Sequence, residues 1–150
     1  MEVARSGAQA AQQVARQLPL QAGAWRDVPA REVATRIYRR WLATVPWTEK
    51  SSAATTLLLL ACDAQGYARI WQIGDGLLLC RIRGEVQVIT PERTGFGNQT
   101  RALGVQLAWS DWHTSSFRLE KPGDLAILMT DGVADDLPAP TLDGFAAVAH

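Results

Sequence analysis

Two aspartates, each followed by a glycine, stand where a hydrophobic segment ends, and their carboxylates could bind a divalent cation. Asp75 lies in the Gly-Asp-Gly segment 74–76, and Asp131 follows a run of apolar residues with only Thr130 between them. Carboxylate oxygens are preferred ligands of hard cations such as Mg²⁺ and Mn²⁺, and strand ends hold them with little ordering cost. Asp-Gly is also a favoured turn dipeptide. The spacing alone therefore leaves both a metal site and two ordinary turns open.

The segments around these aspartates have the composition of β-strands. Runs of β-branched and large apolar residues, bounded by Gly, Asp and Pro, predict strands and tight turns. The predicted strands are 54–62, 67–73, 77–82, 85–89, 115–119 and 124–129. The first and last are apolar on both faces, as expected in a sheet that is covered on both sides. Between the last two strands, Pro122-Gly123 suits the centre of a type II turn. The segment 91–104 is predicted to be a loop.

Two amphipathic segments at the start of the chain predict a helical hairpin. The first runs from about Val3 to Leu18 and carries a stripe of small residues, Gly7 and Ala8 among them, so it should pack closely against its neighbour. The second begins near Pro29 and ends before Pro46. Its apolar stripe is Val33, Ile37, Trp41 and Val45, with arginines on the other side. Helices followed by mostly antiparallel strands predict an α+β fold in which the hairpin packs on the sheet.

Composition narrows the classes of protein that the chain can represent. Among 150 residues, 15 basic side chains balance 15 acidic ones, so no overall field attracts nucleic acid or an anionic membrane. The longest apolar run, 57–62, is too short to span a bilayer, and no signal peptide pattern opens the chain. Cys62 and Cys80 are expected to be buried thiols rather than a disulfide, and His113 a hydrogen-bonded residue rather than a ligand. We expect a soluble, cytoplasmic, single domain.

Four motifs in order make the segment 52–136 resemble a metal-dependent protein phosphatase of the protein phosphatase 2C family, in particular its bacterial branch. The matching segments are Ala54-Thr55-Thr56-Leu57-Leu58, Ile73-Gly74-Asp75-Gly76, Asn98-Gln99-Thr100 and Leu128-Met129-Thr130-Asp131-Gly132-Val133. The helical hairpin before them occupies the place of the family's first two helices. The resemblance implies a layered α-β-β-α sandwich, here incomplete.

The resemblance also implies a chemistry. Two or three Mg²⁺ or Mn²⁺ ions would activate a water that attacks the phosphorus of a phosphoserine or phosphothreonine in a protein substrate. Asp131 would be a core metal ligand, and Asp75 would face the same ions directly or through water. The flanking residues that the resemblance places near this site are Gly74, Gly76, Asn98, Thr100, Thr130 and Gly132. No further catalytic residue is assigned.

The chain also departs from the family pattern. The Asp-Gly-x-Gly motif that precedes the family's first helix is absent, as is its phosphate-binding basic residue, and Asp143 could stand in for the closing aspartate. We therefore expect residues 1–150 to form one phosphatase-like domain, truncated at both ends, that self-associates through exposed sheet edges. Two alternatives stay open. One is a non-catalytic phosphatase-like domain that binds proteins, and the other is a small α+β binding module with incidental Asp-Gly turns.

Overall fold

The computed structural model describes residues 2–17, 25–46, 51–90, 101–105, 108–130 and 132–133. Its two α-helices come first in the chain, and the strands follow them. The elements are α1 (Glu2–Gln17), α2 (Ala30–Thr44), β1 (Leu57–Cys62), β2 (Tyr67–Ile73), β3 (Leu77–Ile82), β4 (Glu85–Val88), the 3₁₀ helix η2 (Trp109–Asp111), β5 (His113–Arg118) and β6 (Leu125–Met129). The α+β class predicted from the sequence is confirmed. In the described part of the chain, no helix has the length and apolar character needed to cross a membrane.

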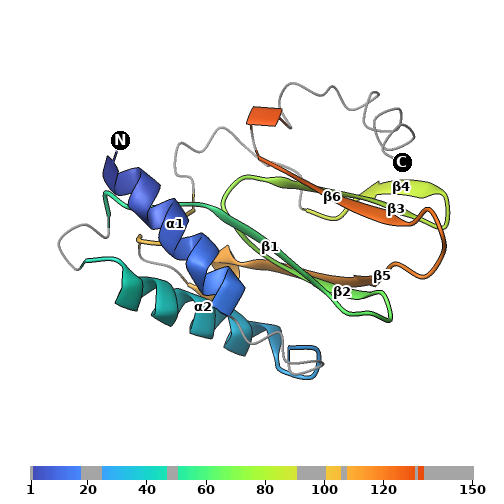
Figure 1. The fold of residues 1–150 in the computed structure, drawn as a ribbon, viewed down its shortest axis with the longest axis horizontal. Coiled ribbons are helices and arrows are strands. Elements are labelled where there is room, and N and C mark those ends of the chain that lie inside the picture. The colour runs from blue at the N-terminus through green and yellow to red at the C-terminus, as the bar shows by residue number, and fades with distance from the viewer. Residues whose placement is uncertain are drawn as a thin grey trace.

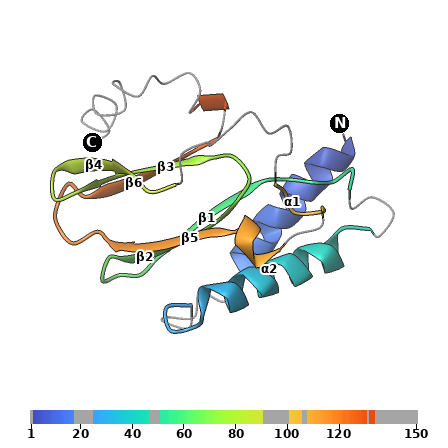
Figure 2. The same cartoon turned by 180° about the vertical axis from the view of Figure 1, so that it is seen from behind.

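The described strands form two three-stranded antiparallel sheets, one in the order β1-β2-β5 and the other in the order β4-β3-β6. The two helices cover one face of the β1-β2-β5 sheet, and the second sheet lies on its other face (Figures 1 and 2). One helical layer and two sheets thus form three of the four layers of the α-β-β-α sandwich that was expected from the sequence. The strand β3 follows Asp75 and lies at the centre of the second sheet, so it fixes where that aspartate sits.

The helix pair packs on the first sheet through the apolar stripe of α2. Val33, Ile37 and Trp41 are buried as predicted, and they join Trp71 of β2 in one core. Pro29 precedes α2 as its N-cap residue, where a missing N–H costs nothing. Two indole groups fix the helices to their surroundings, because the Nε1–H of Trp41 donates to the carbonyl of Gly7 at 3.0 Å and that of Trp71 donates to a carbonyl at the start of α2.

The small residues of α1 allow the close approach that the sequence predicts. A Cβ on Gly7 would lie 1.8 Å from the carbonyl oxygen of Ala53, so only glycine fits there. The predicted stripe was wrong in one detail: Ala8 is exposed, and Ala10 is buried beside Ala11 instead. The helix is rotated so that the small residues at three- and four-residue spacing from Gly7 face the sheet.

A second core fills the space between the two sheets. Ile70 of β2 faces Leu78 and Cys80 of β3, and all three are fully buried. Both thiols are free, as expected, but the prediction that both are buried holds for Cys80 and is wrong for Cys62, which is exposed as the last residue of the edge strand β1. Successive side chains of β3 point to opposite faces, so Leu78 and Cys80 face the first sheet and Leu79 faces away from it.

The start of β1 differs from the prediction for a physical reason. Pairing of β1 with β2 ends at Leu57 and Ile73, because the chain turns away at Gly74. Thr55 instead exchanges both backbone hydrogen bonds with Leu103, at 3.1 and 2.8 Å. Residues 91–100 of the predicted loop lie outside the described residues, whereas its end at Leu103 makes this bridge.

Candidate functional site

The Gly-Asp-Gly segment forms a tight connection between the end of β2 and the start of β3. Gly74 has φ +86°, a conformation that other residues seldom adopt. A Cβ at this position would lie 2.3 Å from Cγ2 of Thr56 and 2.6 Å from the carbonyl oxygen of Arg101. Asp75 follows in a half-buried position. Sterics therefore require glycine before the aspartate, and the surrounding chain holds the turn in one place.

The buried side chain of Gln72 fixes this turn from inside. Its Nε2 donates one hydrogen bond to the carbonyl of Gly74 at 3.1 Å and another to that of Gly76 at 2.8 Å. The two acceptors flank Asp75, so one amide group holds both sides of the aspartate. Gln72 is only 4% exposed, and its Oε1 has no hydrogen-bond partner among the residues that the structure describes. Burial of an unpaired oxygen costs free energy, so the two bonds must outweigh that cost.

Other polar side chains hold β4 and β5 near the turn. The Oγ1 of Thr90 accepts a hydrogen bond from the backbone N–H of Leu78 at 3.3 Å. The Nε2 of His113 lies 3.1 Å from the carbonyl oxygen of Ile89, which confirms the interpretation of this histidine as a hydrogen-bonded residue. His113 also lies opposite Gln72 in the β2–β5 register. These contacts join both sheets at the end of the sandwich that carries Asp75.

The end of β6 lies beside the same turn. Met129 pairs with Leu77, and its carbonyl oxygen is 3.4 Å from the place of a Cβ on Gly76. Thr130 follows in an exposed position and accepts a hydrogen bond from the backbone N–H of Val133 at 3.2 Å. In the sequence, Asp75 precedes the Leu77–Met129 pair by two residues and Asp131 follows it by two.

Three of the residues that the resemblance assigns to the site, Asp131, Asn98 and Thr100, lie outside the described residues. The other five, Asp75, Gly74, Gly76, Thr130 and Gly132, are described.

Within the described ranges, no group of three or more His, Cys, Asp or Glu side chains could hold a metal ion. Asp75 alone cannot satisfy the six or more oxygen positions of a hard cation. The described residues therefore do not by themselves complete a divalent-metal site.

Sequence reasoning missed two residues at this turn. One is Gln72, a polar residue near the end of a mostly apolar strand and two positions before Gly74. A polar side chain at such a position indicates a buried hydrogen-bonding role. Arg101 was missed because it lies far from the turn in the chain, and no local pattern links the two. Its backbone contacts Gly74, and its guanidinium forms an ion pair with Asp111 at 3.2 Å.

The fold and the turn together define a class: a two-sheet sandwich with a helix pair on one face and an Asp-Gly turn at a sheet end. The family model for protein phosphatase 2C matches residues 2–149, which is nearly the whole chain. The chain belongs to the protein phosphatase 2C family. The resemblance proposed from the sequence motifs is thereby confirmed.

Solved structures agree with this assignment at the level of the fold. The chain is similar to the phosphatase domain of the cell fate determinant SpoIIE from Bacillus subtilis, with 16% sequence identity and a TM-score of 0.51. A second structure of that domain, presoaked with Mn, gives 14% identity and the same TM-score. The alignments cover 96% of this chain but 56% and 57% of the SpoIIE domain, so the chain spans a little over half of that domain's length. No curated protein matches the chain.

Proposed function

We propose that this chain contributes to the metal-dependent hydrolysis of phosphoserine or phosphothreonine in a protein substrate, with Mg²⁺ or Mn²⁺ as the cofactor. Membership of the protein phosphatase 2C family supports the reaction class. The single observation that carries the proposal is the β3–β6 register, in which Leu77 and Met129 pair. Asp75 and Asp131 are each two residues from this pair in the sequence, so one pair of strands can present both carboxylates at one end.

The chain's own residues would prepare this site rather than react. Gln72 and Gly74 hold the turn, so that the backbone at Asp75 is in place before any ion binds, and pre-organised sites lower the entropy cost of binding. Asp131 would supply a second carboxylate. When bound, divalent ions lower the pKa of a coordinated water and offset the charge of phosphoryl oxygens. Further carboxylates are needed, since two cannot fill the coordination shells of two ions.

Hydrolysis of a phosphothreonine peptide tests this proposal. The wild-type chain, Asp75→Asn and the control Asp27→Asn should be compared with Mn²⁺ present and with Mn²⁺ removed by a chelator. Asp27 is exposed and lies just before α2, away from the turn. Its substitution therefore removes the same charge as Asp75→Asn but at a position outside the proposed site. We expect metal-dependent turnover that Asp27→Asn retains and that Asp75→Asn lowers by about tenfold or more, as for residues that support a metal site.

The same assay distinguishes the proposed hydrolase from the second candidate, a non-catalytic phosphatase-like domain that binds proteins. That domain would bind the phosphopeptide without releasing phosphate, and chelation of the metal would leave its affinity unchanged. Turnover that both aspartate variants retain in full would overturn the assignment of Asp75 to the site.

A further inference from the structure

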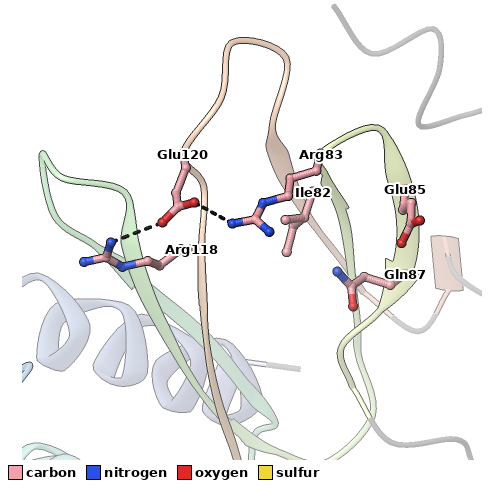
Figure 3. A pocket seen from close by; sticks show the side chains of 6 residues that line it. All are labelled: Ile82, Arg83, Glu85, Gln87, Arg118 and Glu120. Carbon is pink, nitrogen blue, oxygen red and sulfur yellow. Dashed lines mark hydrogen bonds and ion pairs between the residues drawn. The ribbon is translucent and has the colours of Figure 1, made fainter.

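A pocket of about 460 Å³ lies at the other end of the sandwich from Asp75. The strand β3 starts next to the Asp75 turn, at Leu77, and ends at Ile82, where the pocket begins. The residues that line it come from the β3–β4 hairpin and from the end of β5. They are Ile82, Arg83, Glu85, Gln87, Arg118 and Glu120 (Figure 3). This place is separate from the turn to which the phosphatase function is assigned.

The strand β4 has its polar residues on the side that faces the other sheet. Glu85 pairs with Ile82, and Gln87 pairs with Cys80, so both share the inward face of β3. The apolar Val88 points outward instead and is 45% exposed. Inter-sheet faces are normally apolar. The reversed pattern makes the space beside β4 a polar pocket rather than a continuation of the core.

Arg83 is held in a conformation that its turn does not favour for arginine. It has φ +54°, and in the structure it is the one described non-glycine residue with positive φ. Two-residue hairpin turns of this kind prefer Asn, Asp or Gly at such positions. The carboxylate of Asp124 accepts a hydrogen bond from the backbone N–H of Arg83 at 2.7 Å and thereby fixes the strained residue. Strain that the surrounding structure maintains is often found at functional sites.

The two guanidinium groups of the pocket share one carboxylate. Arg83 Nη2 donates to Glu120 Oε2 at 2.9 Å, and Arg118 Nη1 donates to Glu120 Oε1 at 3.1 Å, as the dashed lines in Figure 3 show. A guanidinium has five N–H donors, so each arginine keeps donors that Glu120 does not use. Glu120 places the two cations on either side of itself and offsets their mutual repulsion.

We propose that this pocket binds a small oxyanion, a carboxylate or phosphate group, through those guanidinium donors of Arg83 and Arg118 that Glu120 does not use. Both side chains are accessible, with 64% and 49% of their surfaces exposed, and forked N–H donors match the oxygens of these groups. Ile82 supplies an apolar wall, Gln87 a further hydrogen-bonding group and Glu85 a second carboxylate, so the oxyanion is held by directed N–H donors rather than by a net positive charge. The alternative explanation is that the inward charges on β4 only protect a sheet edge from pairing. This alternative predicts that the pocket binds no anion.

The substitution Arg83→Asn separates the two explanations. Asparagine suits the positive φ of the turn but lacks the guanidinium, so this variant should fold at least as stably as the wild type and still lose the anion. The second variant, Arg118→Gln, removes the other cation without touching the turn. The control is Arg36→Gln, because Arg36 also forms an ion pair, with Glu32, on the exposed face of α2.

Heteronuclear NMR titrations of the full chain with inorganic phosphate and with succinate, in a chelating buffer, measure the binding. We expect saturable shifts of the amides of residues 82–87 and 118–120, and about tenfold weaker binding in each pocket variant, the value of one lost charge-assisted hydrogen bond. Saturation by phosphate but not succinate, or the reverse, identifies the group that the pocket takes. Absence of saturation in the wild type, or equal weakening by Arg36→Gln, would overturn the proposal.

Discussion

The substitution Gln72→Glu should destabilise the protein strongly at neutral pH and much less in acid. The amide of Gln72 donates to two carbonyl oxygens, on Gly74 and Gly76. A carboxylate in its place would face both oxygens as a further acceptor. Leaving a buried charge without a partner typically costs about 3–5 kcal/mol. Glutamate has nearly the same size as glutamine, so packing changes little.

The pH dependence has a definite sign. In the folded variant, the new carboxyl group should have a pKa above its unfolded value of about 4.3, because only the protonated form can donate a hydrogen bond to a carbonyl. Folding then binds a proton. The variant should keep most of its stability below about pH 4 and lose it as the pH rises through the folded pKa. In acid one of the two hydrogen bonds is still missing, which leaves a deficit of about 1 kcal/mol.

The substitution Gln72→Leu gives a second, smaller value. It removes two hydrogen bonds worth about 1 kcal/mol each, but it also removes the buried Oε1, which has no partner in the described part of the chain, and so recovers about 1 kcal/mol. The net loss should be about 1 kcal/mol, independent of pH.

Urea unfolding followed by tryptophan fluorescence, near pH 4 and at neutral pH, measures the free energy of unfolding of the wild type, Gln72→Glu and Gln72→Leu. Gln65→Glu in the exposed turn after β1 is the matched control and should change stability by less than about 0.5 kcal/mol. If Gln72→Glu is as stable at neutral pH as this control, Gln72 does not hold the turn in the way described.

Three further predictions concern packing, thiol chemistry and association. Gly7→Ala should lower the free energy of unfolding by about 1–3 kcal/mol, because the new Cβ would overlap the carbonyl of Ala53, and this outweighs the better helix propensity of alanine; urea unfolding measures it. Burial raises the pKa of Cys80 to about 12, so iodoacetamide should label only Cys62 in the folded chain and both thiols in denaturant, as counted by mass spectrometry. The edge strands β1 and β6 carry no charged residue and no proline, so light scattering should detect self-association that grows with concentration; a monodisperse monomer would refute this.

The parts of the fold with strong local signals could be predicted from the sequence. The bounds of β2 and β3 are as predicted, because apolar runs there end at Gly-containing turns that allow no continuation. The turn before β6 also has the predicted form, with Gly123 at φ +91° and the N–H of Asp124 bonded to the carbonyl of Lys121 at 2.9 Å. In each case a residue with a particular backbone preference marks the boundary.

Contacts between distant segments could not be predicted in this way. The pairing of Thr55 with Leu103 joins residues 48 positions apart, and composition described the second segment only as a loop. The first residues of β5 were missed because His113 is a strand residue through its pairing with Gln72, not through its own propensity. For the site, the Asp75 turn was evident from its glycines, whereas the contact of Arg101 with Gly74 depends on the tertiary structure.

The most direct test of the central claim is a calorimetric titration of Mn²⁺ into the wild-type chain, Asp75→Asn and Asp131→Asn. If both aspartates serve one metal site, the wild type should bind Mn²⁺ saturably, Asp131→Asn should abolish that binding, and Asp75→Asn should weaken it. Asp27→Asn controls for the loss of one negative charge. Equal binding by all four proteins, or no binding by the wild type, would contradict the assignment of the two aspartates to a phosphatase metal centre.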